Sequence, residues 1–161
     1  MSEIIVAKSA GFCFGVSRSV RMAEAMLESG PALSCGPLIH NADVVTRLAS
    51  RGLRVIASPD EAGPGDRVLI RSHGVSLAEE EALRSRGAEI ADATCPNVAR
   101  IHRLVREASA AGRGVLVIGR ADHPEVRAIC GRCDGARVAA DAQELEILLN
   151  SEPDLREKPL T

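Results

Sequence analysis

The chain has 161 residues, a length that predicts one domain or two small domains sharing an interface. Its 20 basic and 22 acidic residues nearly cancel, which argues against the basic surface of a nucleic-acid-binding protein and against the excess charge of a disordered chain. The longest aliphatic runs are far shorter than the roughly 20 residues of a membrane-spanning helix, so no membrane association is expected.

Short aliphatic runs alternate along the chain with segments whose apolar residues recur at helical spacing. The runs predict mostly buried strands over residues 3–7, 55–56, 68–71, 89–91, 115–118 and 137–139. Helices are expected over residues 16–28, 43–50, 77–86, 98–111 and 142–149, and helix ends are marked by Gly30, Gly52, Gly87 and Gly112. This alternation predicts an α/β fold with a parallel sheet covered by helices on both faces.

Five residues with ligand chemistry stand in the turns of this pattern: Cys13, His40, His73, Cys95 and His123. Ligands of parallel α/β sheets gather at the carboxyl ends of the strands. The common placement of these residues therefore indicates one shared site.

The chain also repeats itself with a period of about 82 residues. The matched residues are Cys13, Val16, Arg18, Gly36 and His40 in the first unit and Cys95, Val98, Arg100, Gly119 and His123 in the second. Each unit offers one cysteine and one histidine to a shared centre. The first unit continues into the strand over residues 68–71, whereas the second reaches the polar segment 150–158 without an equivalent strand. The second lobe is therefore expected to lack its last strand.

The cysteines are expected to be free thiols or metal ligands in a reducing cytoplasm, because the chain begins without a basic leader and their number is odd. Cys13 and Cys95 are interpreted as thiolates on a metal, with Phe12 and Phe14 shielding the site. A lone cysteine is more often a small buried hydrophobic residue, and it is the repeat that favours the ligand interpretation for this pair.

The remaining cysteines and the fourth histidine are interpreted without a function. Cys130 and Cys133 form a C-x-x-C motif, but it has no second pair and does not open a helix after a strand. Cys35 is assigned to the core, and His102 lies inside a helical segment. No glycine-rich phosphate loop or dinucleotide motif is found.

His40, His73 and His123 are expected beside helix N-termini, with Asn41 and Ser72 as polar neighbours. The partial positive charge of such termini suits a phosphate or a diphosphate. Glu125, beside His123, is placed to transfer a proton. The residues alone leave alternatives open: a lone histidine is more often a capping or core residue, and a lone glutamate such as Glu125 is more often a surface residue or one at a helix N-terminus.

Five segments together resemble the 4-hydroxy-3-methylbut-2-enyl diphosphate reductase family, iron–sulfur enzymes of the last step of the methylerythritol phosphate route to isoprenoids. They read AGFCFGV (10–16), GPLIHN (36–41), RSHGV (71–75), DATCP (92–96) and HPEV (123–126). They occur in order and extend over nearly the whole chain.

The resemblance implies a trefoil of three similar α/β lobes around a [4Fe-4S] cluster. By this resemblance Cys13 and Cys95 are two of three cluster ligands, and His40, His73 and His123 hold the substrate diphosphate. Glu125 matches the acid that supplies protons to the leaving hydroxyl. The implied reaction is a two-electron reductive dehydroxylation that gives isopentenyl and dimethylallyl diphosphate, with electrons from a donor such as ferredoxin or flavodoxin.

The resemblance also has gaps, because the third cluster cysteine and a Ser/Asn-rich diphosphate cradle belong to a third lobe that these residues do not contain. The chain is expected to comprise an N-terminal strand within residues 1–12, a first lobe over 13–94 and a truncated second lobe over 95–161. One hypothesis is an N-terminal portion of the reductase with little or no activity alone. The other is a non-catalytic module that binds a diphosphate or a metal and needs a partner chain for the third ligand.

Overall fold

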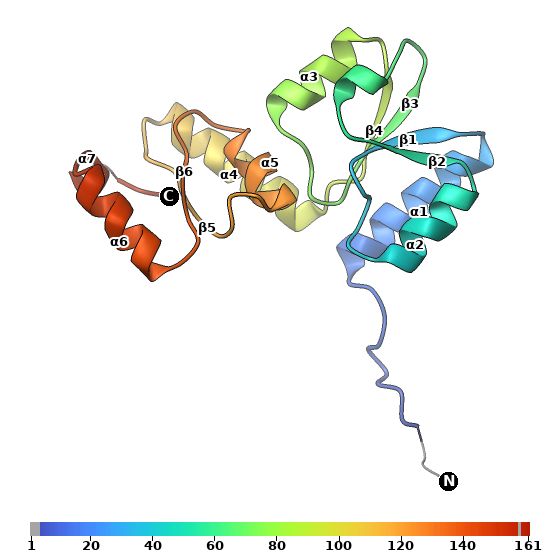
Figure 1. Cartoon of the computed structure of the whole chain (residues 1–161), viewed down its shortest axis with the longest axis horizontal. Helices are drawn as coiled ribbons and strands as arrows, with labels where there is room; N and C mark the ends of the chain where they lie inside the picture. Colours follow the sequence, from blue (N-terminus) through green and yellow to red (C-terminus); the bar gives the residue numbers. More distant parts are fainter. Residues whose placement is uncertain (1–3, 158) are drawn as a thin grey trace.

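The structure, a computed structural model, describes residues 4–157 and 159–161 and arranges their strands in two separate parallel sheets (Figure 1). The α/β class with parallel sheets is thereby confirmed. The elements in chain order are α1 (Phe14–Glu28), β1 (Ala32–Cys35), α2 (Ala42–Ser50), β2 (Leu53–Ile56), η1 (Pro59–Glu61), β3 (Arg67–Ile70), α3 (Leu77–Ser85), β4 (Glu89–Asp92), α4 (Pro96–Ala110), β5 (Leu116–Ile118), α5 (Pro124–Cys130), β6 (Arg137–Ala139), α6 (Ala142–Ser151) and α7 (Asp154–Glu157).

The first lobe, α1 to β4, is built on a four-stranded sheet with the order β2-β1-β3-β4, in which every neighbouring pair is parallel. Successive side chains of a strand point to opposite faces of the sheet, which creates two cores. Leu69 of β3 packs with α1 and α2 on one face, whereas Val68 and Ile70 pack with Leu83 of α3 on the other. The parallel strands bring the loops 36–41, 71–75 and 93–95 to one edge, which we call the carboxyl edge.

The second lobe, α4 to residue 161, repeats the beginning of the first. β5 pairs in parallel with β6 as β1 does with β2, and α1 and α4 each have 15 residues and follow a cysteine. On the other side of β5, Gly114 forms a parallel bridge with Leu160. The place that β3 takes beside β1 is thus occupied by residues 159–161. These residues form an isolated bridge rather than a strand, so the expectation that the second lobe is incomplete holds for the described residues.

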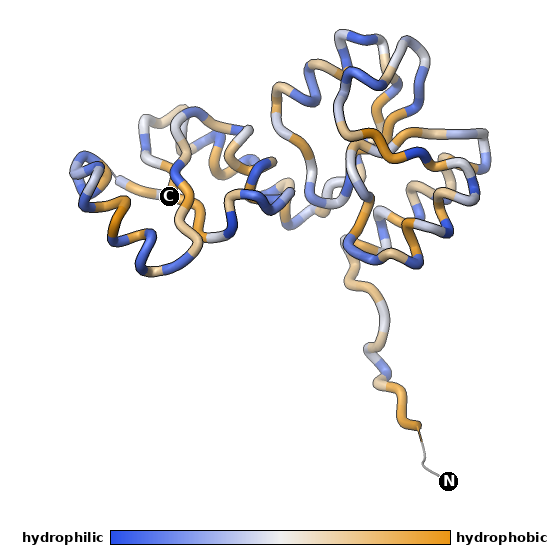
Figure 2. Tube along the Cα trace, viewed as in Figure 1, coloured by the Kyte–Doolittle hydropathy of each residue, from blue (hydrophilic) through white to orange (hydrophobic). Residues whose placement is uncertain are grey.

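The strand expected over residues 3–7 is not formed by residues 4–7, and residue 3 lies outside the described residues. Ile4, Ile5 and Val6 are 89, 84 and 73% exposed. Figure 2 shows this apolar segment leading away from the first lobe. An aliphatic run forms a strand only where a neighbour satisfies its backbone groups, and no described strand pairs with it.

Four elements were not predicted from the sequence: β1, α5 and the short helices η1 and α7. The strand β1 is the central strand of its sheet and is buried along its length, but Pro31 and Ser34 interrupt its aliphatic pattern. The helix α5 has only seven residues, too few for a helical period to be recognised. The lobe limits 13–94 and 95–161 stay a prediction.

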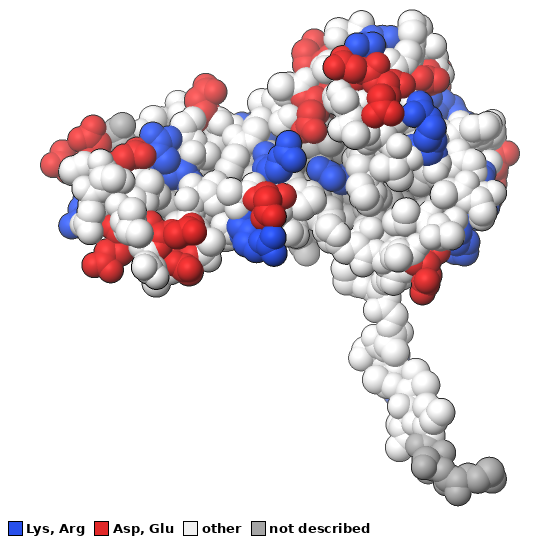
Figure 3. Space-filling view, in the orientation of Figure 1, with Lys and Arg blue, Asp and Glu red and all other residues white. Residues whose placement is uncertain are grey.

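The glycines expected at helix ends, Gly30, Gly52, Gly87 and Gly112, all have positive φ, which residues other than glycine rarely adopt. No helix within residues 4–157 and 159–161 is long and apolar enough to cross a membrane. Figure 3 shows acidic and basic side chains interspersed over both lobes on the face in view.

Candidate functional site

Hydrogen bonds between successive loops align the carboxyl edge of the first lobe. Ser72 donates from its backbone N–H (3.3 Å) and from its hydroxyl (3.1 Å) to the carbonyl of Leu38. The backbone N–H of Cys95 in turn donates to the carbonyl of Ser72, at 2.9 Å. The loops that carry His40, His73 and Cys95 are therefore held side by side by their own backbones.

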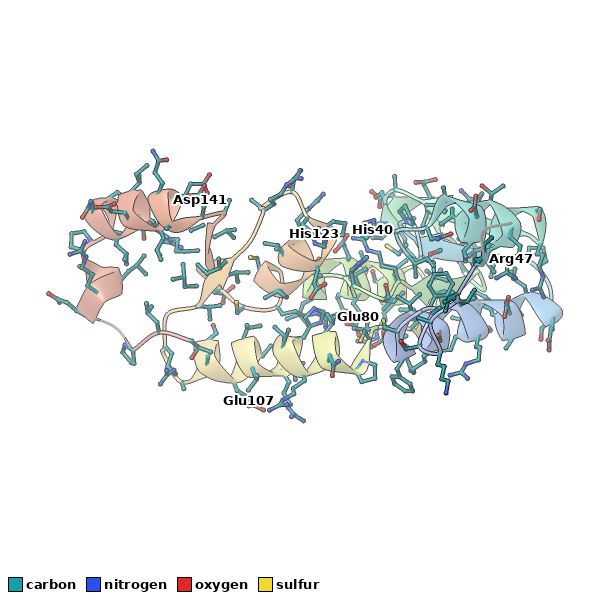
Figure 4. All side chains as sticks on the ribbon, turned by 90° about the horizontal axis from the view of Figure 1, so that it is seen from below. His40, Arg47, Glu80, Glu107, His123 and Asp141 are labelled. Carbon is teal, nitrogen blue, oxygen red and sulfur yellow. The ribbon has the colours of Figure 1, made fainter. Side chains whose placement is uncertain are left out.

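Three of the four histidines meet at this edge, and they come from both lobes. The ring centroids of His40 and His73 lie 4.7 Å apart, and the ring of His123 lies 5.6 Å from His40 and 5.7 Å from His73. Figure 4 shows His40 and His123 next to each other where the lobes meet. We call these three residues the histidine cluster. The structure thus brings together the three histidines that the sequence placed at one site.

A small pocket of about 200 Å³ adjoins the cluster and connects it to the segment around Cys13. Its lining comes from the first turn of α1 and from the loops that precede α1, α2 and α3, namely Phe12, Val16, Ile39, His40, Asn41, Ser72 and His73. The amide oxygen of Asn41 accepts a hydrogen bond from the N–H of Val44 at 3.0 Å and caps α2. The cap fixes the backbone beside His40.

His73 is the member of the cluster with a buried ring nitrogen, Nδ1, that lacks a hydrogen-bond partner within the described residues. Burial, followed by the nearby His40, Arg71 and His123, lowers the pKa of His73 from 6.5 to about 4. The ring is therefore neutral at pH 7. An anion that brought negative charge and acceptor oxygens to this position would stabilise the protonated form instead.

Cys13 and Cys95 occupy equivalent positions, since each is the N-cap residue of a 15-residue helix. At five other helix starts the N-cap side chain accepts a backbone hydrogen bond, as with Asn41, Ser58, Ser76, His123 and Asp141. Neither cysteine side chain does so. Both sulfur atoms are therefore uncommitted within the described residues, and each lies at a helix N-terminus, which carries partial positive charge.

Side chains of α1 tie its N-terminal half to the loop that ends in Cys95. The Arg18 guanidinium donates to the carbonyls of Thr94 (3.1 Å) and Asp92 (3.3 Å). The Ser19 hydroxyl is buried and donates to the carbonyl of Ala93 at 2.8 Å. These bonds were not predicted, although the repeated spacing from cysteine to arginine marked Arg18. They bring the beginnings of α1 and α4, and hence the two cysteines, to one place.

Gly15 explains how closely the two helix starts approach. A Cβ added at Gly15 would lie 2.5 Å from the Cys95 sulfur and 3.0 Å from its Cβ. The sulfur of Cys95 thus lies against the first turn of α1, two residues from Cys13. Sequence reasoning quoted Gly15 within a motif but assigned it no contact.

Replacing Gly15 with Ala is expected to destabilise the chain by about 1–3 kcal/mol, because the added methyl overlaps Cys95. A loss of stability would itself indicate the overlap, because replacing Gly with Ala inside a helix ordinarily stabilises a protein by up to about 1 kcal/mol. Urea denaturation measures the difference. The control is Gly63→Ala, whose Cβ would meet only an Asp66 oxygen at 3.7 Å. A Gly15→Ala chain at least as stable as the parent would contradict the close approach.

Glu125 lies beside the histidine cluster at the start of α5. Its backbone N–H donates to Nδ1 of His123 at 3.2 Å, so His123 caps this helix. Glu125 and His123 border a groove of about 400 Å³, whose other walls are mostly aliphatic side chains of α4, β5 and α5. The half-buried carboxyl group of Glu125 is thus open to the groove.

The sequence indicates no function for four further residues, namely Cys35, His102, Cys130 and Cys133. Each of them lies away from the carboxyl edge or is buried. Burial raises the pKa values of Cys35, Cys130 and Cys133, which disfavours the thiolate form that binds metals. His102 is 6% exposed and packs against Gly74. Within the described part of the chain, no group of three or more His, Cys, Asp or Glu side chains is placed to hold a metal ion.

Comparison with known proteins points to one family. The family model described as "LytB protein" matches residues 4–157. A 4-hydroxy-3-methylbut-2-enyl diphosphate reductase of Nitratidesulfovibrio vulgaris is 41% identical over 147 residues, 89% of this chain and 52% of its own length. The enzyme of that name from Geobacter sulfurreducens is 43% identical over 150 residues, 92% of this chain and 53% of its own. The chain therefore spans about half the length of the curated relatives it matches.

Solved structures agree with these relatives. A structure of (E)-4-hydroxy-3-methyl-but-2-enyl diphosphate reductase, described as the terminal enzyme of the non-mevalonate pathway, has a TM-score of 0.76 and 39% identity. It matches over 93% of this chain and 55% of its own. The E-1-hydroxy-2-methyl-but-2-enyl-4-diphosphate reductase of Plasmodium falciparum matches 96% of this chain and 57% of its own, with a TM-score of 0.84. At 19% identity, the second likeness concerns the fold alone.

Proposed function

Because the chain belongs to the LytB protein family, we propose that it provides the diphosphate-binding histidines and two cluster ligands of a 4-hydroxy-3-methylbut-2-enyl diphosphate reductase. The observation that carries this proposal is the meeting of His40, His73 and His123, from both lobes, beside the loops that lead to two uncommitted cysteines. Curated relatives of that name match most of this chain.

The histidine cluster provides the binding site for the diphosphate. Three imidazoles within 6 Å of one another can each donate an N–H to a separate phosphate oxygen. His73 contributes most, because its buried Nδ1 has no hydrogen-bond partner within residues 4–157 and 159–161 and gains a bond when an oxygen arrives. The first turn of α2 lies two residues after His40 and adds its partial positive charge.

Cys13 and Cys95 fit an iron–sulfur cluster as part of its ligand set. Their sulfurs are uncommitted within the described residues and lie at adjoining helix starts. A four-iron cluster is commonly held by four cysteines, so two thiols account for only part of the donors. We propose that the further ligand comes from residues outside this chain, as the matched length of the relatives suggests. Such a cluster, when bound, supplies electrons one at a time from a donor such as ferredoxin or flavodoxin.

Glu125 provides a proton to the departing hydroxyl of the substrate. The overall reaction adds two electrons and two protons to the allylic alcohol, breaks its C–O bond and releases water. With the diphosphate on the histidine cluster, the aliphatic walls of the groove beside Glu125 suit a five-carbon chain. A carboxylic acid at that border can protonate the leaving oxygen without water crossing the apolar wall.

Fusion of this chain to the C-terminal half of the Geobacter sulfurreducens reductase tests the proposal. The fusion is expected to reduce 4-hydroxy-3-methylbut-2-enyl diphosphate anaerobically with a strong reductant, whereas the 161-residue chain alone shows little or no turnover. The Glu125→Gln fusion provides the control, with substrate binding retained and turnover lost. An inactive fusion that still binds iron and substrate would contradict the proposal.

A non-catalytic module that binds a diphosphate or a metal is the second candidate. It is favoured by one observation, the lack of a third metal donor near Cys13 and Cys95 among the described residues. The two candidates differ in what the chain does in a reducing cytoplasm, where we propose that it acts. A module would bind diphosphate without iron, and the fusion would show binding but no Glu125-dependent turnover.

A further inference from the structure

The short helix α5 connects the histidine cluster to a second contact between the lobes. His123 is the N-cap residue of α5 and Gly131 is its C-cap residue. Seven helical residues rise only about 10 Å along the axis. A shift of one end of so short and rigid an element therefore moves the other.

At its C-terminal end α5 is bonded to the first lobe by backbone and side-chain groups. The N–H of Leu77 donates to the carbonyl of Gly131 at 3.0 Å. The Arg132 guanidinium donates through Nε to the carbonyl of Val75 and through Nη1 to the Glu80 carboxylate, both at 2.8 Å. The Arg132 and Glu80 side chains are only 10% and 18% exposed. This ion pair is shielded from water, unlike those on the surface of the chain.

The packing at this contact leaves no room for a larger residue. A Cβ added at Gly131 would overlap the Cβ of Ser76, the N-cap residue of α3. Ser76 is itself fixed by a capping box, in which its hydroxyl accepts from the N–H of Glu79 and its own N–H donates to the Glu79 carboxylate. The first-lobe side of the contact is therefore rigid.

The same first-lobe loop carries both His73 and the carbonyl of Val75. Arg132 is thus hydrogen-bonded to this loop at Val75, two residues after His73, whose ring lies near that of His123. We propose that Gly131 and Arg132 form a clamp between the lobes that positions His123, through α5, against His40 and His73. Arg132 is a positioning residue, since the groups it contacts lie outside the histidine cluster.

The functional meaning of the clamp rests on the proposed diphosphate site, but its geometry can be tested without a ligand. The chain is labelled with ¹³C-histidine, and nuclear Overhauser effects between the carbon-bound protons of the rings report which rings are in contact. In Arg132→Ala, the contact between His73 and His123 is expected to be lost. The contact between His40 and His73, both in the first lobe, is expected to remain. It serves as the internal control for folding.

A matched control is Arg137→Ala, which removes an ion pair with Glu152 inside the second lobe. Both ring contacts are expected to persist in that variant. Arg132→Lys keeps the positive charge, but its ammonium group cannot reproduce the paired guanidinium bonds to Val75 and Glu80. This variant tests the clamp if Arg132→Ala unfolds the second lobe. Partial recovery of the contact between His73 and His123 supports the clamp. An unchanged contact in both Arg132 variants overturns it.

Titration with an organic diphosphate separates the clamp from the proposed function. Arg132→Ala is expected to bind the diphosphate about tenfold more weakly than Arg137→Ala, because one of three imidazoles is displaced. If the parent chain binds no diphosphate, the proposed function is refuted. The clamp still stands in that case if Arg132→Ala loses the contact between His73 and His123. Equal affinities despite a lost contact would refute the positioning role.

Discussion

Replacing Cys95 with Ala is expected to abolish iron uptake when the chain is incubated anaerobically with ferrous iron, sulfide and a small thiol that can supply the remaining ligands. Cys13 and Cys95 have uncommitted sulfurs at adjoining helix starts, so the parent chain can chelate with two thiolates. A single thiolate loses that chelation. The affinity for iron should fall by more than the roughly 10–100-fold seen when a residue that hydrogen-bonds to a metal ligand, rather than a ligand itself, is removed. Bound iron per chain and visible charge-transfer absorption measure it.

Two other cysteines provide the controls for this experiment. Cys35→Ala and Cys133→Ala should take up iron like the parent, because burial raises the pKa values of both thiols and disfavours their thiolates. Iron that stays bound in Cys95→Ala but is lost from Cys133→Ala would assign the metal to the C-x-x-C motif. That outcome would remove the basis for a cluster at the carboxyl edge.

Replacing His73 with Gln is expected to weaken binding of an organic diphosphate by roughly 10–100-fold at pH 7, the range for a lost hydrogen bond to a charged group. The variant should also bind with less dependence on pH. The pKa of His73 is lowered to about 4 by burial, and a bound diphosphate raises it. Between these two pKa values, affinity for the anion therefore rises as the pH falls. Calorimetric titrations from pH 8 to pH 5 measure the trend.

His102→Gln is the matched control for His73→Gln. Burial also lowers the pKa of His102 to about 4, but His102 lies in α4 and does not line the pocket beside the cluster. The protonation of the diphosphate itself affects both variants equally. The free energy of unfolding is measured in parallel. The pKa values of His73 and His102 are about 4 in the folded chain and 6.5 in the unfolded chain, so the folded chain loses stability as the pH falls from 6.5 towards 4. Equal diphosphate affinities in the two variants would refute the role of His73.

The places of the candidate site residues in the fold could be predicted from the sequence, because they depend on local rules. Aliphatic runs followed by polar turns placed His73 and Cys95 at the ends of β3 and β4, where parallel strands expose their loops. The repeat paired Cys13 with Cys95, and the structure places both at the starts of helices of equal length. Such features need only spacing along the chain.

Features that depend on contacts between distant segments could not be predicted. The run at residues 4–7 has the composition of a strand but no partner in the described structure, whereas β1 has a broken pattern and is stabilised by strands on both sides. Gly15 and Arg132 acquire their roles only when the lobes and helix starts meet. Nothing in their immediate sequence indicates what they touch.

The parallel bridge between Gly114 and Leu160 also bears on the order in which the chain folds. The sheet of the first lobe is complete once residue 92 has been synthesised, and its strand partners are close in sequence. In the second lobe, β5 gains a neighbour on its open side only when residue 160 has emerged. On the ribosome, the first lobe can thus form while the second is still being made, and it offers a finished surface against which α5 docks.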